Sequence, residues 1–247
     1  MPVPTPRSAL AVHRLTAVRQ PAPLPPVLLL HGFASSARAD FGAWAELLAD
    51  AGRDAYLIDL PGHGDSPAIA GTAATTDAVV AALASTVDAL GAERVDVIGY
   101  SLGARLAWEL PAATGRVRRL VLGGLSPFEP FAGVDVVAVA RAVDGEPPAD
   151  PFAGMMAGMV SGPGRDTDSL LALIAGLGSQ PFAPEDPAAT RPDVPTLFVA
   201  GADDAMTQGL EGLTAIVPDA RLVRVPGDHL GALASSEFRA AALTFLA

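Results

Sequence analysis

Residues 95–103, which read Val-Asp-Val-Ile-Gly-Tyr-Ser-Leu-Gly, decide the fold. The apolar run at the start predicts a buried strand, and the residues that follow Leu102 predict a helix. A chain that passes directly from strand to helix turns sharply at Ser101, and Gly99 and Gly103 leave room for that turn. The turn would raise the Ser101 hydroxyl above the strand end as a nucleophile. It would also aim the Leu102 N–H, as one oxyanion-hole donor, at a bound acyl oxygen.

Short apolar runs alternate with helical patterns on both sides of this stretch. Strands buried on both faces of a parallel sheet have this composition, so the chain is predicted to be α/β, with a three-layer, mostly parallel sheet. One helix is expected to begin with Asp40 as its N-cap, and another to end at Pro111. Expected strands are 8–19, 27–30, 56–60, 95–98, 117–122, 196–200 and 221–225; expected helices are 40–51, 76–90, 102–110, 206–216 and 235–246.

Residues 126–192 interrupt this alternation. Three helical patches, near 131–143, 151–160 and 167–177, are separated by Gly and Pro, and no strand is evident. We expect a small helical cap or lid there, inserted before the strand that bears the candidate acid. The core domain would then be residues 1–125 and 193–247.

A serine nucleophile needs a base, and the chain has four histidines. His229 follows the last expected strand and should lie on a loop at the carboxyl edge of the sheet, where ligands collect in open α/β sheets. His13 falls in the opening strand, and His31 and His63 fall in loops that they would shape. His229 is therefore the candidate base.

The base in turn needs a carboxylate to orient it. Asp203 and Asp204 follow the strand after the insert, and the spacing from Gly201 favours Asp204. Glu129 is a more distant candidate. Asp228 adjoins His229 in sequence, where its carboxylate is badly placed to meet the imidazole.

The second oxyanion donor should come from the loop after residues 27–30. Gly32 permits a close approach of the backbone there, and the Phe33 N–H can point into the site. The Phe33 ring would form a wall of the acyl pocket or pack as an ordinary core aromatic.

Five motifs carry a resemblance to a known family: His-Gly-Phe at 31–33, Asp-Leu-Pro-Gly-His-Gly-Asp-Ser at 59–66, Gly-Tyr-Ser-Leu-Gly at 99–103, Gly-x-x-Asp at 201–204, and His229. Together they resemble the α/β-hydrolase superfamily, in its serine esterase or lipase-like branch with a short helical cap. The resemblance implies that fold and a catalytic triad in the chain order Ser101, Asp204, His229. It does not select a substrate, because the superfamily hosts many activities.

The expected activity is hydrolysis of small to medium, neutral or apolar carboxylic esters through an acyl-enzyme on Ser101. The alternatives are a lyase like those of menaquinone biosynthesis, a thioesterase, a lactonase or a carbon–carbon bond hydrolase with the same triad. Arg105 would meet substrate carboxylates if the lyase resemblance holds, or it would pair with Glu109, four residues on. The substrate is expected to contact Gly32, Tyr100, Phe128, Met155 and Met159, although the cap methionines could equally pack the cap onto the core.

Composition excludes several other classes. The chain has 247 residues, no cysteine, sixteen basic residues that are all arginine, and a formal net charge of −11. Thiolate nucleophiles, lysine Schiff bases and P-loop sites are thereby excluded, and a nucleic-acid partner is not expected. No cofactor or metal is expected. The N-terminus does not resemble a secretory signal and no apolar run is long enough to span a membrane, so we expect a cytoplasmic monomer or dimer.

Overall fold

The computed structural model describes residues 9–17, 24–186 and 188–247. In this part of the chain seven strands form one sheet, in the order β1-β3-β2-β4-β5-β6-β7. β1 pairs antiparallel with β3, and the other neighbouring pairs are parallel, which confirms the predicted class. The ends of the strand expected over 8–19 lie outside the described residues. The strands are β1 (Val12–Leu15), β2 (Val27–Leu30), β3 (Ala55–Ile58), β4 (Val95–Tyr100), β5 (Val117–Gly123), β6 (Thr196–Gly201) and β7 (Ala220–Val225).

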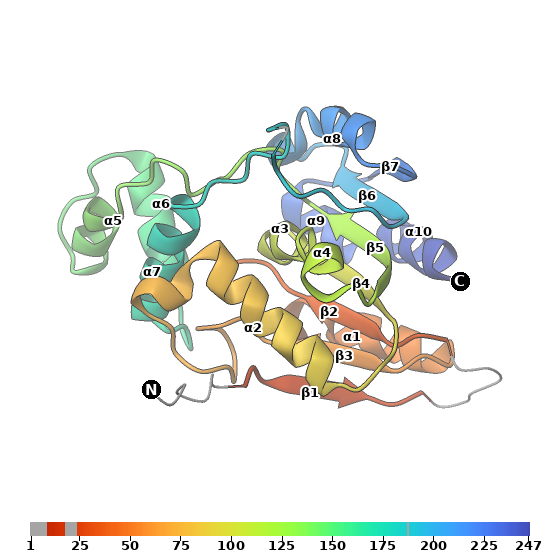
Figure 1. The fold of residues 1–247 in the computed structure, drawn as a ribbon. Helices are drawn as coiled ribbons and strands as arrows, with labels where there is room; N and C mark the ends of the chain where they lie inside the picture. Colours follow the sequence, from red (N-terminus) through yellow and green to blue (C-terminus); the bar gives the residue numbers. More distant parts are fainter. Residues whose placement is uncertain (1–8, 18–23, 187) are drawn as a thin grey trace.

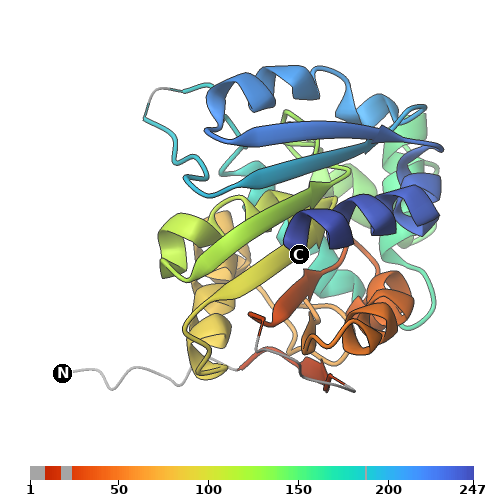
Figure 2. The same ribbon diagram turned by 90° about the vertical axis from the view of Figure 1, so that its right-hand side faces the viewer.

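Helices cover both faces of the sheet and make the other two layers. Figure 2 shows α1 (Ala37–Asp50) and α10 (Ser236–Leu246) on one face, where Trp44 packs against Phe238. The opposite face carries α2 (Thr76–Ala89), α3 (Leu102–Ala107), α4 (Leu110–Thr114) and α8 (Leu210–Ile216), as Figure 1 shows. β2 and β4 are buried along their whole length between these layers, which explains their unbroken apolar runs.

Three helix boundaries differ from the prediction. The helix expected over 206–216 is divided into the 3-10 helix η2 (Ala205–Thr207) and α8, which begins at Leu210. α1 begins at Ala37, because Ser36 is the N-cap and its hydroxyl accepts the Ala39 N–H; Asp40 lies in the first turn instead. Pro111 does not end a helix. α3 ends at Ala107, and Pro111 occupies the first turn of α4, where its missing N–H breaks no helical hydrogen bond.

The described part of residues 126–192, hereafter the insert, contains three α-helices and no strand. They are α5 (Val136–Val143), α6 (Pro151–Val160) and α7 (Thr167–Gly178), and Figure 1 shows them beside α2. α7 packs on the short 3-10 helix η1 (Gly71–Ala74), and the Ser169 hydroxyl accepts the Ile69 N–H at 2.9 Å. The insert therefore rests on the loop that follows β3.

None of the helices in the part of the chain that the structure describes has both the length and the apolar composition that crossing a bilayer requires.

Candidate active site

Ser101 occupies a strained turn between β4 and α3. Its backbone has φ +53° and ψ −115°, a conformation that residues other than glycine rarely adopt. The Ser101 N–H donates to the Gly123 carbonyl at 2.8 Å, which ties the turn to β5. A Cβ atom on Gly99 would collide with the Gly103 backbone, and one on Gly103 would collide with the end of β2. The two glycines are thus required by close backbone approaches around the serine.

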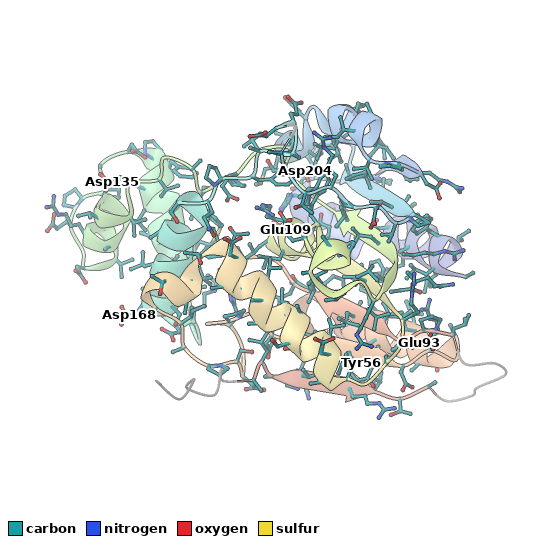
Figure 3. All side chains as sticks on the ribbon, viewed as in Figure 1. Tyr56, Glu93, Glu109, Asp135, Asp168 and Asp204 are labelled. Atoms are coloured by element: carbon teal, nitrogen blue, oxygen red, sulfur yellow. The ribbon has the colours of Figure 1, made fainter. Side chains whose placement is uncertain are left out.

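Ser101, His229 and Asp204 form one hydrogen-bonded series. The distance from His229 Nε2 to Ser101 Oγ is 3.0 Å, and the distance from His229 Nδ1 to Asp204 Oδ2 is 2.8 Å. Asp204, labelled in Figure 3, follows β6. It is buried, and its other oxygen accepts the Met206 N–H at 3.0 Å. The histidine side chain is 24% exposed, so the site opens to solvent on the side of the base. Asp203, the neighbouring candidate acid, is exposed.

His229 does not lie on a loop, as the sequence predicted, but is the first residue of the short helix α9 (His229–Ala234). The Asp228 carboxylate caps this helix by accepting the Gly231 N–H at 2.8 Å. Tyr100 supports it from below: its hydroxyl donates to the His229 carbonyl oxygen. Burial raises the pKa of Tyr100, which keeps the phenol protonated as that donor. Tyr100, expected among the substrate contacts, is thus 2% exposed and lies beneath the histidine.

The loop after β2 lies directly beside Ser101. A Cβ atom on Gly32 would be 3.5 Å from the Ser101 Cβ. The Gly32 N–H donates to Asp40 Oδ2 at 2.8 Å, and the Ala34 N–H donates to His63 Nε2 at 3.0 Å. Between these two fixed amides, the Phe33 N–H makes no hydrogen bond within the described residues, and neither does the Leu102 N–H.

Asp40 was missed as a site residue, because its position in the sequence reads equally well as a helix cap. Its second carboxylate oxygen accepts the Ser35 hydroxyl, so one side chain holds the loop at two points. No pattern along the sequence could have revealed it, because its hydrogen bonds to Gly32 and Ser35 depend on how the loop lies against α1.

His31 and His63 support the same loop as neutral rings. Burial lowers the pKa of His31 to about 4 and that of His63 to about 3. Each ring accepts a backbone N–H with Nε2: His31 from Leu60 at 3.0 Å, and His63 from Ala34 at 3.0 Å. Neither contacts Ser101 through a hydrogen bond, so His229 is the histidine that meets the Ser101 hydroxyl.

One group of possible metal ligands occurs within the described residues: His13, Asp59 and Asp65. His13 Nε2 lies 3.1 Å from Asp59 Oδ2 and 3.6 Å from Asp65 Oδ2. Asp59 is buried and also accepts the Ala37 and Asp65 N–H groups, so these contacts secure the turn after β3. The group contains no member of the hydrogen-bonded series.

The remaining expected substrate contacts do not gather around Ser101. Phe128 is 55% exposed and Met155 52% exposed, whereas Met159 packs half-buried against the apolar cluster under the insert. The Phe33 ring lies 4.9 Å from the ring of Phe131, which belongs to the insert.

Arg105 pairs with Glu109 at 2.9 Å, which was one of its two expected roles. It also lines a hollow of about 780 Å³ between α2, the α3–α4 region and residues 180–190. Ser101, Asp204 and His229 are not among the residues that line this hollow.

Comparison with known proteins identifies the family. Residues 25–142 match the alpha/beta hydrolase fold family. A 2-hydroxy-6-oxononadienedioate/2-hydroxy-6-oxononatrienedioate hydrolase of Pseudomonas putida is 38% identical over 113 residues. This match covers 42% of the chain and 40% of that relative, so the chain spans about two fifths of the length of the curated relatives it matches.

Solved structures match over nearly the whole chain. A hydrolase from Pseudomonas aeruginosa is 25% identical with a TM-score of 0.74, and the match covers 96% of this chain and 94% of the hydrolase. The enol-lactonase from Burkholderia xenovorans is 18% identical with a TM-score of 0.74, and 96% of each chain is covered. The mostly parallel sheet of this chain, with helices on both faces, agrees with these matches, and the chain belongs to the α/β-hydrolase superfamily.

Proposed function

We propose that this chain is a serine hydrolase that cleaves a bond at a carbonyl carbon. The observation that carries the proposal is the series Ser101–His229–Asp204, with contacts of 3.0 and 2.8 Å, beside two backbone amides with no hydrogen bond within the described residues. In this proposal residues 126–192 act as a cap over a core made of residues 1–125 and 193–247.

The reaction would proceed in two steps. His229 takes the Ser101 proton as the oxygen attacks the carbonyl carbon, and the N–H groups of Phe33 and Leu102 stabilise the resulting oxyanion. His229 then returns the proton to the leaving group, which leaves an acyl-enzyme. Water, deprotonated by His229, attacks the acyl carbon and releases the acid and Ser101. Asp204 holds the imidazole tautomer and stabilises its protonated form throughout.

We favour a carbon–carbon bond beside a ketone as the bond that is cleaved. The substrate named for the Pseudomonas putida relative contains no ester, so its hydrolysis must break such a bond. The acyl fragment takes the hydroxyl of water, and the departing carbon takes the proton from His229. The substrate must therefore stabilise negative charge on that carbon, as an enolate does. The relatives favour this alternative over the carboxylesterase that we expected from the sequence.

A carboxylic ester remains the second candidate, because the site has few cations for a substrate with two carboxylates. In the insert the basic residues are Arg141, Arg165 and Arg191, of which the first two are exposed and the third is half-buried. Arg105 is already paired with Glu109 and Glu129. A neutral or singly charged substrate suits these surroundings.

Two substrates distinguish the candidates. A 2-hydroxy-6-oxodienoate with an uncharged 6-substituent would lose its absorbance on carbon–carbon cleavage, and a p-nitrophenyl ester series from acetyl to dodecanoyl would release p-nitrophenolate. We expect turnover of the dienoate to exceed that of the best ester, and Ser101→Ala to abolish both. Ser85→Ala, on the exposed side of α2, is the matched control and should retain activity. Higher turnover of esters would establish the second candidate, and activity that survives Ser101→Ala would overturn the proposal.

A further inference from the structure

Arg105 lies one helical turn after Ser101 and contacts three separate segments. Its side chain is 10% exposed, and its Nη1 donates to Glu109 Oε1 at 2.9 Å. Its Nε lies 3.6 Å from Glu129 Oε2, and both of these atoms are buried without a hydrogen-bond partner within the described residues. Its guanidinium carbon lies 4.4 Å from the centre of the Phe182 ring, a cation–π distance.

Two of these partners lie near the two ends of the insert, in the segments that join its helices to the core. Glu129 lies between β5 and α5, and Phe182 follows α7. Trp108, three residues after Arg105, repeats the pattern: its ring lies 5.2 Å from Phe182, and its Nε1 donates to the Thr190 carbonyl at 2.9 Å. Arg105 in α3 and Trp108, the residue that follows this helix, therefore hold both connections between the insert helices and the core.

These contacts continue to the oxyanion loop. Glu129 Oε1 accepts the Phe131 N–H at 3.2 Å, and the Phe131 ring lies 4.9 Å from Phe33. Phe33 and Leu102, the first residue of α3, carry the two candidate oxyanion N–H groups. Arg105 thus connects, through Glu129 and Phe131, the helix behind one donor to the aromatic wall beside the other.

The buried carboxylate needs Arg105. Burial raises the pKa of Glu129, while the Phe131 N–H and the Arg105 charge act in the opposite direction. A carboxylate with a 2% exposed side chain and no cation nearby would be costly, so the segment that carries it is held where the guanidinium is. Arg105 in turn has little freedom to meet a ligand, because Glu109, Glu129 and Phe182 surround it.

We propose that Arg105 is a positioning residue that, through Glu129, holds Phe131 against Phe33 and so shapes the pocket for the acyl group. In this role Arg105 determines the size of the acyl group that the pocket accepts, and it does not bind a substrate carboxylate. The inference rests on the proposed role of Ser101 as nucleophile.

The test uses two fluorophosphonates, one with a small ethyl group and one with a bulky aryl-alkyl group. Ser101 would attack phosphorus and displace fluoride, and the rate saturates with reagent, which separates the half-saturating concentration from the maximal rate. In Glu129→Gln we expect the half-saturating concentration of the bulky reagent to rise on the order of tenfold, as for one lost aromatic contact. Its maximal rate and the labelling by the small reagent should remain within about twofold, which marks an effect on binding rather than chemistry.

Glu109→Gln is the matched control, because it removes the other ion pair of Arg105 without touching the insert. It should leave both reagents unchanged. Arg105→Met should reproduce the effect of Glu129→Gln, Arg105→Lys should restore part of it, and Arg105→Met combined with Glu129→Gln should be no worse than either single change. If Arg105→Met does not fold, Glu129→Gln and Arg105→Lys suffice.

Equal effects of Glu129→Gln and Glu109→Gln, or none from either, would overturn the inference. A third fluorophosphonate, which bears a carboxylate, tests direct binding: a loss in Arg105→Met that is confined to this reagent would also overturn the inference. Wild-type protein that folds but is not labelled at Ser101 by the small reagent would instead overturn the proposed function itself.

Discussion

At the carboxyl edge of the sheet, close backbone approaches surround Ser101, whereas the helices of the insert pack chiefly through buried apolar side chains, with close backbone approaches at Gly176 and Gly178 of α7. Gly103 lies against the end of β2, Gly32 lies beside Ser101, and the Ser101 N–H is bonded to Gly123. The three insert helices are each capped by an aspartate side chain and pack through apolar residues such as Val139, Met156 and Leu173. The family match runs from residue 25 to 142, so it includes the edge around Ser101 and stops inside the first of these helices. We infer that the proposed chemistry depends on short motifs that fix the backbone, and that the proposed selectivity depends on packing that such motifs do not specify.

The largest expected effect is that of removing the Ser101 hydroxyl, the proposed nucleophile. We expect Ser101→Ala to lower kcat about a millionfold, as for a serine that acts together with its base. Single-turnover assays with the better substrate of the two classes measure this loss. A residual rate above about one hundredth of wild type would show that the turn between β4 and α3 does not hold the nucleophile.

Acid should lower the stability of the protein through buried histidines of the core, a kind of group that the insert lacks. His31 and His63 are buried as neutral rings with pKa values lowered to about 4 and about 3, and the insert contains no histidine. Below pH about 6.5 the two histidines take up protons in the unfolded state but not in the native state. The free energy of unfolding therefore falls by about 1.4 kcal/mol per pH unit for each ring, until the pH reaches the pKa of that ring in the folded protein. Urea unfolding at a series of pH values should show this slope, and His63→Gln should reduce it by one proton. An unchanged slope in His63→Gln would contradict the burial argument.

Asp40→Asn should loosen the oxyanion loop without disturbing the nucleophile. The amide retains one acceptor for the two donors that the carboxylate now serves, the Gly32 N–H and the Ser35 hydroxyl. We expect kcat to fall about tenfold to a hundredfold, somewhat less than the loss of a whole oxyanion donor costs. Asp50→Asn, at the exposed end of the same helix, is the control. Equal kcat values for the two variants would remove Asp40 from the site.

The smallest expected effect is that of a substitution on the surface of the insert. Met155 is 52% exposed, so Met155→Ala should change the free energy of unfolding by less than about 0.5 kcal/mol. Its neighbour Met156 is 3% exposed, and Met156→Ala should cost about 2 to 5 kcal/mol. Chemical denaturation of both variants measures the difference. A substantial loss from Met155→Ala would mean that the exposed methionine is covered in solution.

The strand pattern and the candidate triad could be predicted because local features carry them. Unbroken apolar runs mark β2 and β4, and the spacing after Gly201 distinguishes Asp204 from Asp203. Contacts that depend on three-dimensional packing could not be predicted this way. Asp40 has the composition of a cap, yet Ser36 caps the helix, and no pattern along the chain shows that the two oxygens of Asp40 hold a loop.

The insert shows the same limit. Met155 and Met156 are adjacent and chemically identical, and only the packing of α6 decides that one is exposed and the other buried. Likewise the pairing of Arg105 with Glu109 follows from their spacing of four residues, but its second partner, Glu129, arrives from beyond β5.

His229 lies 128 positions after Ser101 in the chain, and this distance has a consequence for synthesis of the protein. Ribosomes add about 5 to 20 residues per second, so the serine emerges roughly 6 to 26 seconds before the histidine. During that interval the nascent chain contains the turn and the oxyanion loop but no partner for the hydroxyl. If Ser101 is the nucleophile, as proposed, it gains its base only after β7 and α9 have been made, and growing chains would be unreactive toward the cell's metabolites.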